Sequence, residues 1–503
     1  MKKTSMLLLA LVAVSLLFAC APSSQRAAST GAPISGGEIR FGFNSEPATL
    51  DPLSSANTAD GRSILFNVYE GLVKCDPQGI MQPAIAESYE MAMDGSSYSF
   101  VLREGILFSD GTPVTPRDIE FTLNTARDAR FSGFTQIAAV EITGERSIRI
   151  DLNAPDVDFL TYLTIGIVPA DNPDREGNPI GSGPFIIESY TIQQSLVLVK
   201  NPYYWKSGFP YLDKVTLLFA ANSDALYLGL QGGNFDGAVV VGSTVEQLDP
   251  ERFDVVYDFS NSVQMLALNN AVPPLDNLAV RQAINYGIDI DGIIDTAFYG
   301  RGKASGSPLI PGLAAYYDDS LLNPYPVDRE RARQLLAEAG YPQGFPLEIV
   351  VPSNYSMHVD TAQVIVNQLA AIGIAVTIRQ VDWATWLTDI YRGRNFQATV
   401  ISLDSTFVSP RGFLGRYIST TGSNYINFKS EEFDRVYQAA LNEPDLGKRI
   451  ELYKEAQRIV SDNAASVFIQ DIYNFKAFTK GKFGGWVNYP LYVTDFSSVY
   501  RIN

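Results

Sequence analysis

The chain has 503 residues, of which 46% are hydrophobic and 18% are charged, and its formal net charge is −17. This length predicts two or three domains, and the composition is that of a globular chain, which excludes a largely disordered one. The excess of acidic residues argues against nucleic acid as a partner, because phosphate binding requires a basic face.

The N-terminal segment has the layout of a secretory signal. Two lysines precede an apolar stretch from Met6 to Ala19 that is too short to cross a bilayer of about 30 Å as a helix. We therefore predict a signal peptide over residues 1–19. The sequence Leu-Phe-Ala-Cys that ends at Cys20 resembles a bacterial lipoprotein box, which implies lipidation of Cys20; an ordinary secretory signal with an incidental cysteine is the alternative. Residues 20–37, rich in Pro, Ser, Ala, Thr and Gly, predict a flexible tether.

The first predicted strand covers residues 38–43, where apolar and other residues alternate. Asn44, Ser45 and Glu46 follow this strand directly. They are either ligand contacts at a strand end or a solvated turn before Pro47.

The middle of the chain first reads as a turn-rich region and then as a series of strands. In the turn-rich region, a helix is predicted to begin at Thr115, a good capping residue that precedes a proline. Strands are then predicted over about 195–200, 214–220 and 236–241. The apolar strand at 263–270 ends in two amides, and Asn269 is either a ligand contact or a purely structural residue.

Residues 347–403 give the clearest pattern in the sequence. Short apolar strands at 347–351, 374–381 and 396–403 are separated by two helices, the first of which ends at Gly373. This β-α-β-α-β order predicts a parallel sheet with right-handed crossovers. In such sheets ligands bind beyond the carboxyl ends of the strands.

Polar and aromatic residues follow all three of these strands. An Asp before Ser and Thr is also a good turn cap, so Asp404 either caps a turn or contacts a ligand. The two tryptophans lie three positions apart on one helix face and suit either core packing or stacking on a flat ligand. The candidate ligand contacts at this edge are Tyr355, Trp383, Trp386, Asp404, Ser405, Thr406 and Phe407.

The sequence gives little support for catalysis, metal binding or a cofactor. Its single histidine, His358, is predicted to lie in a polar loop, and Gly-x-Ser-x-Gly is absent. Apart from Cys20, only Cys75 could supply a thiol, and we predict that it is buried. We therefore predict no catalytic residues, no metal and no cofactor, although paired carboxylates of a hydrolase stay an alternative.

Five segments of the chain carry a recognisable set of motifs. The longest is "NVYEGLVKCDPQGIMQPAIAESYEMAMDGSSYSFVLREGILFSDGTPVTPRDIEFTLN" at 67–124. It is followed by "GSGPF" at 181–185, "NPYYW" at 201–205, "LDNLAVRQAINYGIDIDGII" at 275–294 and "RQLLAEAGYPQGFPLEIV" at 333–350. In content and order these segments resemble the extracytoplasmic solute-binding proteins of peptide- and nickel-type ABC importers, family 5, and the resemblance covers nearly the whole mature chain.

This resemblance implies an α/β, two-lobed periplasmic-binding-protein type II fold (cluster C) with an extra domain inserted in lobe I. Lobe I would comprise residues 38–69, 180–262 and 476–503. The inserted subdomain would cover 70–179 and lobe II 263–475. The segment 466–478 would be the return crossing between the lobes.

The resemblance also implies a function. We expect a non-enzymatic, monomeric substrate-binding lipoprotein, extracytoplasmic or periplasmic, that captures a peptide or related small solute and delivers it to an ABC permease. In peptide binders of the family an Asp holds the peptide amino group, and Thr406 aligns with it here; the arginine of dipeptide binders is missing from 352–355. An oligosaccharide is therefore an alternative ligand. An envelope hydrolase and a structural or adhesive lipoprotein are alternatives of other classes.

Overall fold

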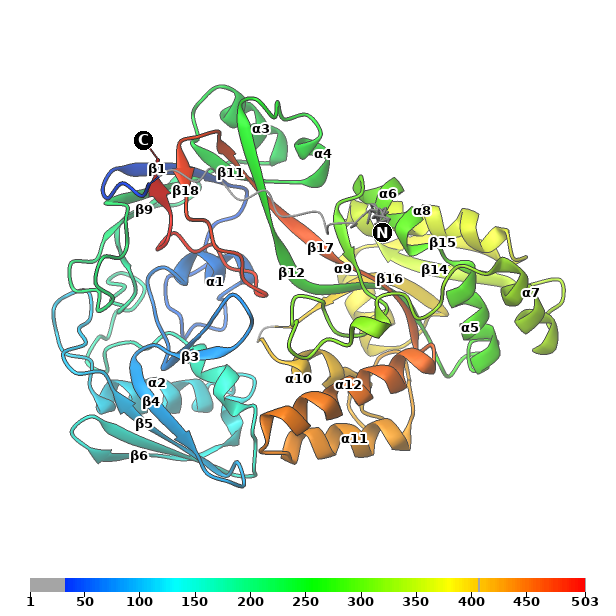
Figure 1. Ribbon diagram of the computed structural model, residues 1–503, viewed down its shortest axis with the longest axis horizontal. Coiled ribbons are helices and arrows are strands. Elements are labelled where there is room, and N and C mark those ends of the chain that lie inside the picture. Colours follow the sequence, from blue (N-terminus) through cyan, green and yellow to red (C-terminus); the bar gives the residue numbers. More distant parts are fainter. Residues whose placement is uncertain (1–31, 406–407, 503) are drawn as a thin grey trace, which may run out of the picture.

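The computed structural model describes residues 32–405 and 408–502 and has two bodies joined by two long strands (Figure 1). β12 (Phe253–Leu268) and β17 (Ser466–Thr479) pair antiparallel to each other and pass from one body to the other. We call the body that contains residues 38–245 lobe I and the body that contains residues 278–462 lobe II. The exact domain boundaries proposed from the sequence stay a prediction.

A single mixed sheet extends through both lobes because β12 and β17 lie at its centre. On the lobe II side, β16 (Ala398–Asp404) pairs with β12; on the lobe I side, β11 (Gly237–Val240) pairs with β17. The further strands are β14 (Pro346–Pro352) and β15 (Ala375–Val381) in lobe II, β13 (Gly302–Ala304) beside β17, and β1 (Glu38–Phe43), β10 (Lys214–Phe219), β9 (Ser195–Lys200) and β8 (Phe185–Thr191) in lobe I.

In lobe I the alternating pattern of β1 produces the predicted strand. The side chains of Ile39 and Phe41 are fully buried, and β1 runs parallel to both β10 and β11. The other elements of this lobe are α1 (Ala59–Leu65), β2 (Val73–Cys75), β3 (Met81–Pro83), α3 (Ser223–Gln231) and α4 (Gly242–Val245). The C-terminal strands β18 (Phe483–Gly484) and β19 (Tyr500–Arg501) pair with each other.

A separate four-stranded antiparallel sheet forms the inserted part of lobe I, which we call the subdomain. Thr115 caps its helix as predicted: its backbone N–H and its hydroxyl both donate to the Asp118 carboxylate, at 2.8 and 2.7 Å. The subdomain comprises, in sheet order, β4 (Ala86–Met91), β5 (Ser97–Leu102), β7 (Ser147–Leu152) and β6 (Ile137–Gly144), with α2 (Pro116–Asp128) and the short helices η1 (Phe134–Gln136) and η2 (Phe159–Thr164).

Lobe II confirms the predicted β-α-β-α-β unit. β14 is parallel to β15 and to β16, so the carboxyl ends of all three strands lie at one edge. The first connecting helix is α8 (Ser356–Ala370); the second is a single turn, α9 (Trp383–Thr385), that continues as the π-helix η4 (Trp386–Arg392). The other helices are α5 (Leu278–Gly287), α6 (Ile290–Phe298), η3 (Asp319–Leu321), α7 (Arg329–Glu338), α10 (Pro410–Leu414), η5 (Gly415–Tyr417), α11 (Glu431–Asn442) and α12 (Leu446–Asp462).

One prediction about lobe II is wrong. His358 does not lie in a polar loop but in the first turn of α8, where it is buried. Its Nδ1 is 3.1 Å from the side-chain nitrogen of Gln264 on β12. The apolar face of α8 that packs on the sheet includes its first turn, which the surrounding polar residues concealed in the sequence.

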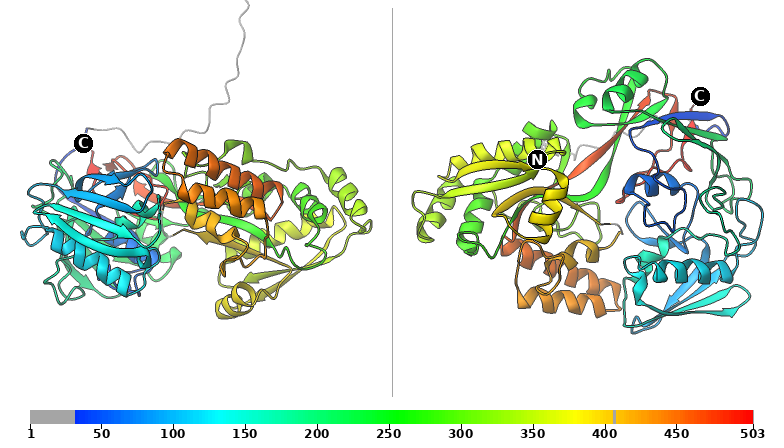
Figure 2. Two further views of the ribbon diagram at one scale, coloured as in Figure 1. Left: turned by 90° about the horizontal axis from the view of Figure 1, so that it is seen from below. Right: turned by 180° about the vertical axis from the view of Figure 1, so that it is seen from behind.

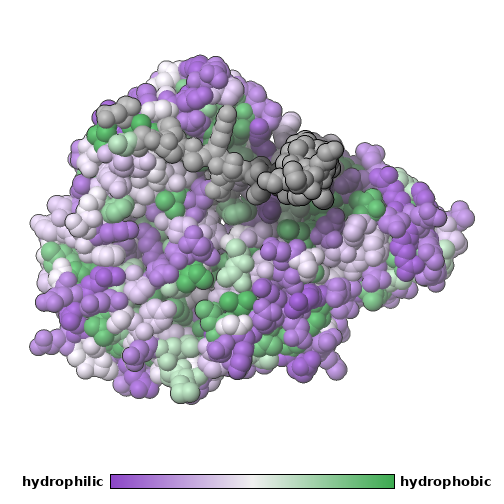
Figure 3. All heavy atoms as spheres, in the orientation of Figure 1, coloured by the Kyte–Doolittle hydropathy of each residue, from purple (hydrophilic) through white to green (hydrophobic). Residues whose placement is uncertain are grey.

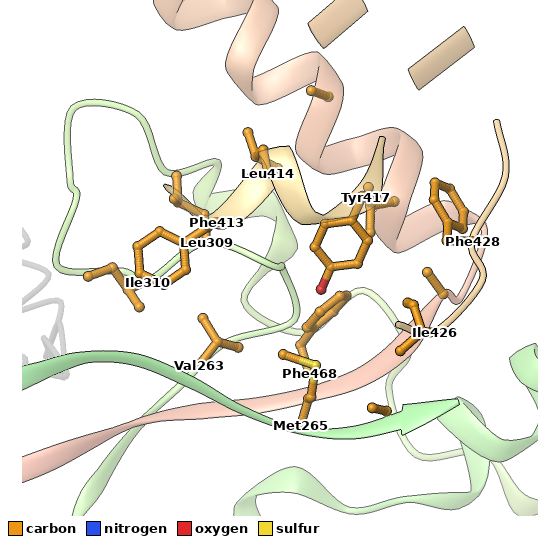
Figure 4. Packing of buried hydrophobic residues seen from close by; sticks show 14 of the residues in the cluster. Val263, Met265, Leu309, Ile310, Phe413, Leu414, Tyr417, Ile426, Phe428 and Phe468 are labelled. Carbon is orange, nitrogen blue, oxygen red and sulfur yellow. The ribbon is translucent and has the colours of Figure 1, made fainter. Parts of the chain in front are cut away.

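The crossing strands are held by a large apolar core in lobe II (Figure 4). Val263 and Met265 of β12 and Phe468 of β17 lie on the side of the strands that faces α10 and η5. Phe413 of α10 and Tyr417 of η5 pack down on them. Each such side chain stabilises the fold by roughly 1.5–3 kcal/mol, so α10 is firmly attached to the strands that join the lobes.

Hydrophilic residues cover much of the outer end of lobe II. Figure 3 shows the end of lobe II around α7 covered mainly by hydrophilic residues, with hydrophobic residues scattered elsewhere on this face. Among residues 32–405 and 408–502, no helix is both long and apolar enough to cross a bilayer.

A candidate binding cavity between the two lobes

A cavity of about 480 Å³ lies where lobe I approaches the crossing strands and the end of β16. Lobe I supplies most of its wall, from residues 52–75, 129–134 and 164–166. Residues 491–493 add to this wall. The opposite wall consists of Ser260 and Asn261 on β12 and Asp404 and Ser405 at the end of β16. The size is that of a pocket for a small organic molecule.

The lobe I wall is largely apolar. Phe66 at the end of α1 contacts Tyr489 edge-on, with ring centroids 5.8 Å apart, and the Lys74 ammonium lies 4.1 Å from the centre of its ring. Burial of a ligand's hydrocarbon against such a surface contributes about 25 cal/mol per Å². The apolar and aromatic residues of the wall are Leu65, Phe66, Tyr69, Val73, Phe131, Phe134, Ile165, Leu491, Tyr492 and Val493.

Five charged side chains line the cavity. Glu70 is already satisfied, because it accepts hydrogen bonds from Tyr204 and Trp205 at 2.9 and 2.7 Å and lies 3.8 Å from Lys74. The cations Arg62 and Arg130 and the anion Asp404 make no ion pair within the described part of the chain. These three groups are therefore the charges available to a ligand.

The charge of Asp404 acts on Arg62 across the cavity. The surrounding protein lowers the pKa of the Arg62 guanidinium through desolvation, while the negative charges of Asp404 and Asp60 raise it. Arg62 stays protonated in any case, because arginine is charged throughout the physiological range. Its head group donates to the carbonyl oxygen of Asn57 at 2.7 Å, which restrains it in the cavity wall.

A local irregularity of β12 shapes the opposite wall. Asn261 has a φ of 58°, and the pairing of β12 with β17 shifts register between Phe259 and Val263. Asparagine tolerates this left-handed conformation better than most residues. The Asn261 side chain donates to the carbonyl oxygen of Ser405, so the bulge is tied to the end of β16. The bulge therefore places Ser260, Asn261, Asp404 and Ser405 together on one wall.

Asp404 and Ser405 are the predicted site residues that the structure brings to the cavity. Asp404 is exposed and Ser405 is buried. Thr406, Phe407 and Cys20 lie outside the described residues.

Three of the predicted aromatic residues, Tyr355, Trp383 and Trp386, lie together and are not part of the cavity lining. The indole rings of Trp383 and Trp386 are stacked with centroids 5.1 Å apart and an interplanar angle of 3°, and Tyr355 meets Trp383 edge-on at 5.5 Å. Trp386 is buried and its indole N–H donates to Thr399 at 3.0 Å. This geometry gives Trp386 a core-packing role, the alternative that the sequence left open.

At the other two predicted strand ends, Glu46 and Asn269 make hydrogen bonds within the fold. Glu46 accepts from the Tyr190 hydroxyl at 2.9 Å and from the Gln193 backbone at 2.7 Å, whereas Asn44 is exposed and Ser45 is half-buried. Asn269 is buried and donates to the carbonyl oxygens of Arg394 and Phe396 at 3.1 and 2.9 Å. None of these four residues lines the cavity.

Sequence reasoning missed the whole lobe I wall. Arg62 lies in the short helix α1, and Arg130 follows α2 with a φ of 59°, so no strand end or motif marks either residue. The packing of lobe I brings both residues to one cavity, a tertiary effect without a local signal. Within residues 32–405 and 408–502, no group of His, Cys, Asp and Glu side chains has the arrangement of a metal site.

Two α/β lobes joined by two crossing strands, with a cavity walled by both, define a two-lobed solute-binding protein. The model of the bacterial extracellular solute-binding proteins, family 5, matches residues 81–425, more than half of the chain. The chain belongs to this family, whose members are extracytoplasmic binding proteins that bind small solutes and deliver them to ABC permeases.

Two relatives are similar to this protein over most of the chain. Heme-binding protein A of Haemophilus influenzae is 29% identical over 428 residues, which is 76% of this chain and 78% of the relative. Glutathione-binding protein GsiB of Escherichia coli O157:H7 is 27% identical over 448 residues, or 84% and 86% of the two chains.

Solved structures agree with the fold. DppA of Helicobacter pylori in complex with the peptide STSA is 25% identical, with a TM-score of 0.73 over 93% of this chain and 99% of that one. HbpA2 of Haemophilus parasuis has a TM-score of 0.83 over 92% of this chain and 100% of that one, at 24% identity. These similarities confirm the predicted two-lobed α/β fold.

Proposed function

We propose that this protein is the non-enzymatic, substrate-binding component of an ABC importer and that it captures a short peptide in the cavity between its lobes. The observation that carries the proposal is the pair of opposite charges on opposite walls, Arg62 on lobe I and Asp404 on lobe II. A ligand that contacts both walls has a higher affinity for the arrangement in which the walls face each other. Only such a difference in affinity between two arrangements shifts the equilibrium between them.

The chemistry of the cavity suits a zwitterion with apolar side chains. The peptide's ammonium would lie at Asp404 and its carboxylate at Arg62, with Arg130 as a second cation for a longer or acidic ligand. Each charge-assisted hydrogen bond contributes about 1.5–3 kcal/mol, and the apolar lobe I wall would bury the side chains. Glutathione, bound by one relative, and the peptide bound by a solved structure belong to this class.

The location and anchoring are part of the same proposal. We expect the mature chain to be held at a membrane surface by lipid on Cys20, as a monomer outside the cytoplasm, and to present its bound peptide to the permease. The net charge of −17 argues against nucleic acid as a partner.

Mass spectrometry of the small molecules released when the purified protein is denatured tests this function. The proposal predicts a peptide, recovered chemically unchanged after incubation with the native protein. A released oligosaccharide would favour the alternative ligand, and cleavage of an added peptide or glycan would favour a hydrolase.

A further inference from the structure

The two lobes also touch each other away from the crossing strands. The segment between β7 and η2 carries Asp156 and Asp158, and it faces α10 and α12 of lobe II. Figure 1 and the right-hand view of Figure 2 both show the α11–α12 pair next to the subdomain. This contact lies at the opposite end of the molecule from the part of β12 and β17 that pairs with β11.

Charged groups from both lobes are buried in this contact. Asp156 pairs with Arg411 of α10, and the Asp158 carboxylate lies 3.6 Å from Nε of Arg449 on α12. The hydroxyl of Tyr453, also on α12, donates to Asp158. The two aspartates are 2% and 6% exposed and Arg449 is 8% exposed, so bulk water contributes little to their solvation.

Hydrogen bonds within the subdomain preorganise the lobe I side of the contact. The backbone N–H of Asp158 donates to the Asp156 carboxylate at 3.1 Å, and the hydroxyl of Tyr98 on β5 donates to the Asp156 carbonyl oxygen at 2.7 Å. Within the described residues, the ion pairs of both aspartates lead only to lobe II. Charge neutrality of the cluster therefore requires that the lobes touch.

The lobe II side is attached to the strands that join the lobes. Arg411 belongs to α10, whose Phe413 packs in the core around Val263 and Phe468 of the crossing strands. Arg449 belongs to α12, whose Tyr453 and Val460 are buried in the same core. A movement of lobe II about the crossing strands therefore moves both arginines relative to the subdomain.

We propose that Asp156, Asp158, Arg411, Arg449 and Tyr453 form an interlobe clasp, which holds the subdomain end of the cavity shut and keeps the Arg62 and Asp404 walls facing each other. Separation of the lobes must hydrate four charged groups and break every pair between them at once. Removal of one partner from a buried pair leaves the other charge uncompensated, so neutralising a single clasp residue favours separation.

Hydrogen exchange measured by mass spectrometry on the full chain, without any added solute, tests the clasp. In Asp158→Asn we expect the amides of η2 on lobe I and of α10 on lobe II to exchange at least tenfold faster, and to do so together. Arg449→Gln should give the same pattern. The double variant should speed exchange by less than the two single effects combined, because both substitutions remove the same interaction.

A matched control is a second ion pair that links the lobes. Arg301 before β13 pairs with Glu246 after α4, and the two side chains are 28% and 46% exposed. Exposed pairs contribute little, so Glu246→Gln should change exchange in η2 and α10 less than twofold. Equal effects of Glu246→Gln and Asp158→Asn would overturn the proposal.

Two further results would contradict the clasp. One is unchanged exchange in both segments of Asp158→Asn; the other is faster exchange on one side of the contact only, which would mean local loosening. If Asp158→Asn does not fold, Asp156→Asn serves instead, because the charge that it leaves uncompensated is that of Arg411, whose side chain is 23% exposed and can be hydrated. Because no solute is present, the clasp can fail while the proposed peptide binding stands, and the reverse also holds.

Discussion

Arg62 of α1 and Asp404 at the end of β16 face the same cavity from opposite lobes, and neither makes an ion pair within the described part of the chain. The Coulombic effect of Asp404 on the pKa of Arg62 shows that the two charges are close enough to interact. They are still too far apart to satisfy each other directly. A dipolar ligand placed between them would satisfy both.

Arg62→Gln should weaken the binding of short peptides about ten- to a hundred-fold, because one charge-assisted hydrogen bond is lost. Isothermal titration with free and C-terminally amidated forms of the same peptide measures this effect. The variant should discriminate less between the two forms than the wild type does. An unchanged ratio would remove Arg62 from the carboxylate subsite.

Asp404→Asn should have the matching effect at the other end of the peptide. We expect a similar loss of affinity for a peptide with a free amino group and little change for its N-acetylated form, because the acetylated nitrogen carries no charge. Asp171→Asn, in an exposed ion pair with Arg117 within lobe I, is a control that should leave binding unchanged. A loss of less than twofold in Asp404→Asn would leave Asp404 as a turn residue only.

The two stacked tryptophans should differ in what they stabilise. Trp386→Leu removes a buried indole and its hydrogen bond to Thr399, and should lower the free energy of unfolding by about 3 kcal/mol or more. Trp383→Leu, at a site 37% exposed, should cost only about 1 kcal/mol. Urea titration followed by far-UV circular dichroism gives both values. Equal costs would mean that Trp383 is as deeply packed as Trp386.

His358 should give the fold a pH dependence below neutrality. Burial lowers the pKa of its imidazole to about 4, against an ordinary value of 6.5. The unfolded chain therefore binds more protons than the folded one between pH 6.5 and 4, so stability falls as the pH falls through this window, by up to about 3 kcal/mol.

Comparison of the wild type with His358→Gln isolates this contribution. Burial also raises the pKa of Asp471 to about 7, which makes stability fall as the pH rises from about 4 to 7 and so acts in the opposite direction. The difference in unfolding free energy between the two proteins, measured at intervals from pH 7 to pH 4, removes the Asp471 effect. A difference that does not change with pH would contradict the account of His358.

Local patterns in the sequence were sufficient for the lobe II sheet and for two residues of the candidate cavity, Asp404 and Ser405. The alternation in residues 38–43 and the three short strands of lobe II predict elements that the structure contains, because burial on a sheet face imposes a period of two or a continuous apolar run. Asp404 was found because a parallel sheet brings its strand ends to one edge.

The rest of the site depends on contacts between residues that are distant in the sequence. Arg62 and Arg130 reach the cavity through the packing of lobe I, and the charges of Asp158 and Arg449 meet only because the subdomain touches α12. The polar residues around His358 likewise concealed its burial. Such effects come from tertiary packing, which overrides local pattern.

The central claim is that one small solute contacts both lobes in the cavity. The most direct test adds the solute released from the purified protein back to the solute-free protein and measures hydrogen exchange. The account predicts slower exchange in both α1, which carries Arg62, and the end of β16, which carries Asp404. Protection of one wall alone, or of a surface away from the cavity, would contradict it.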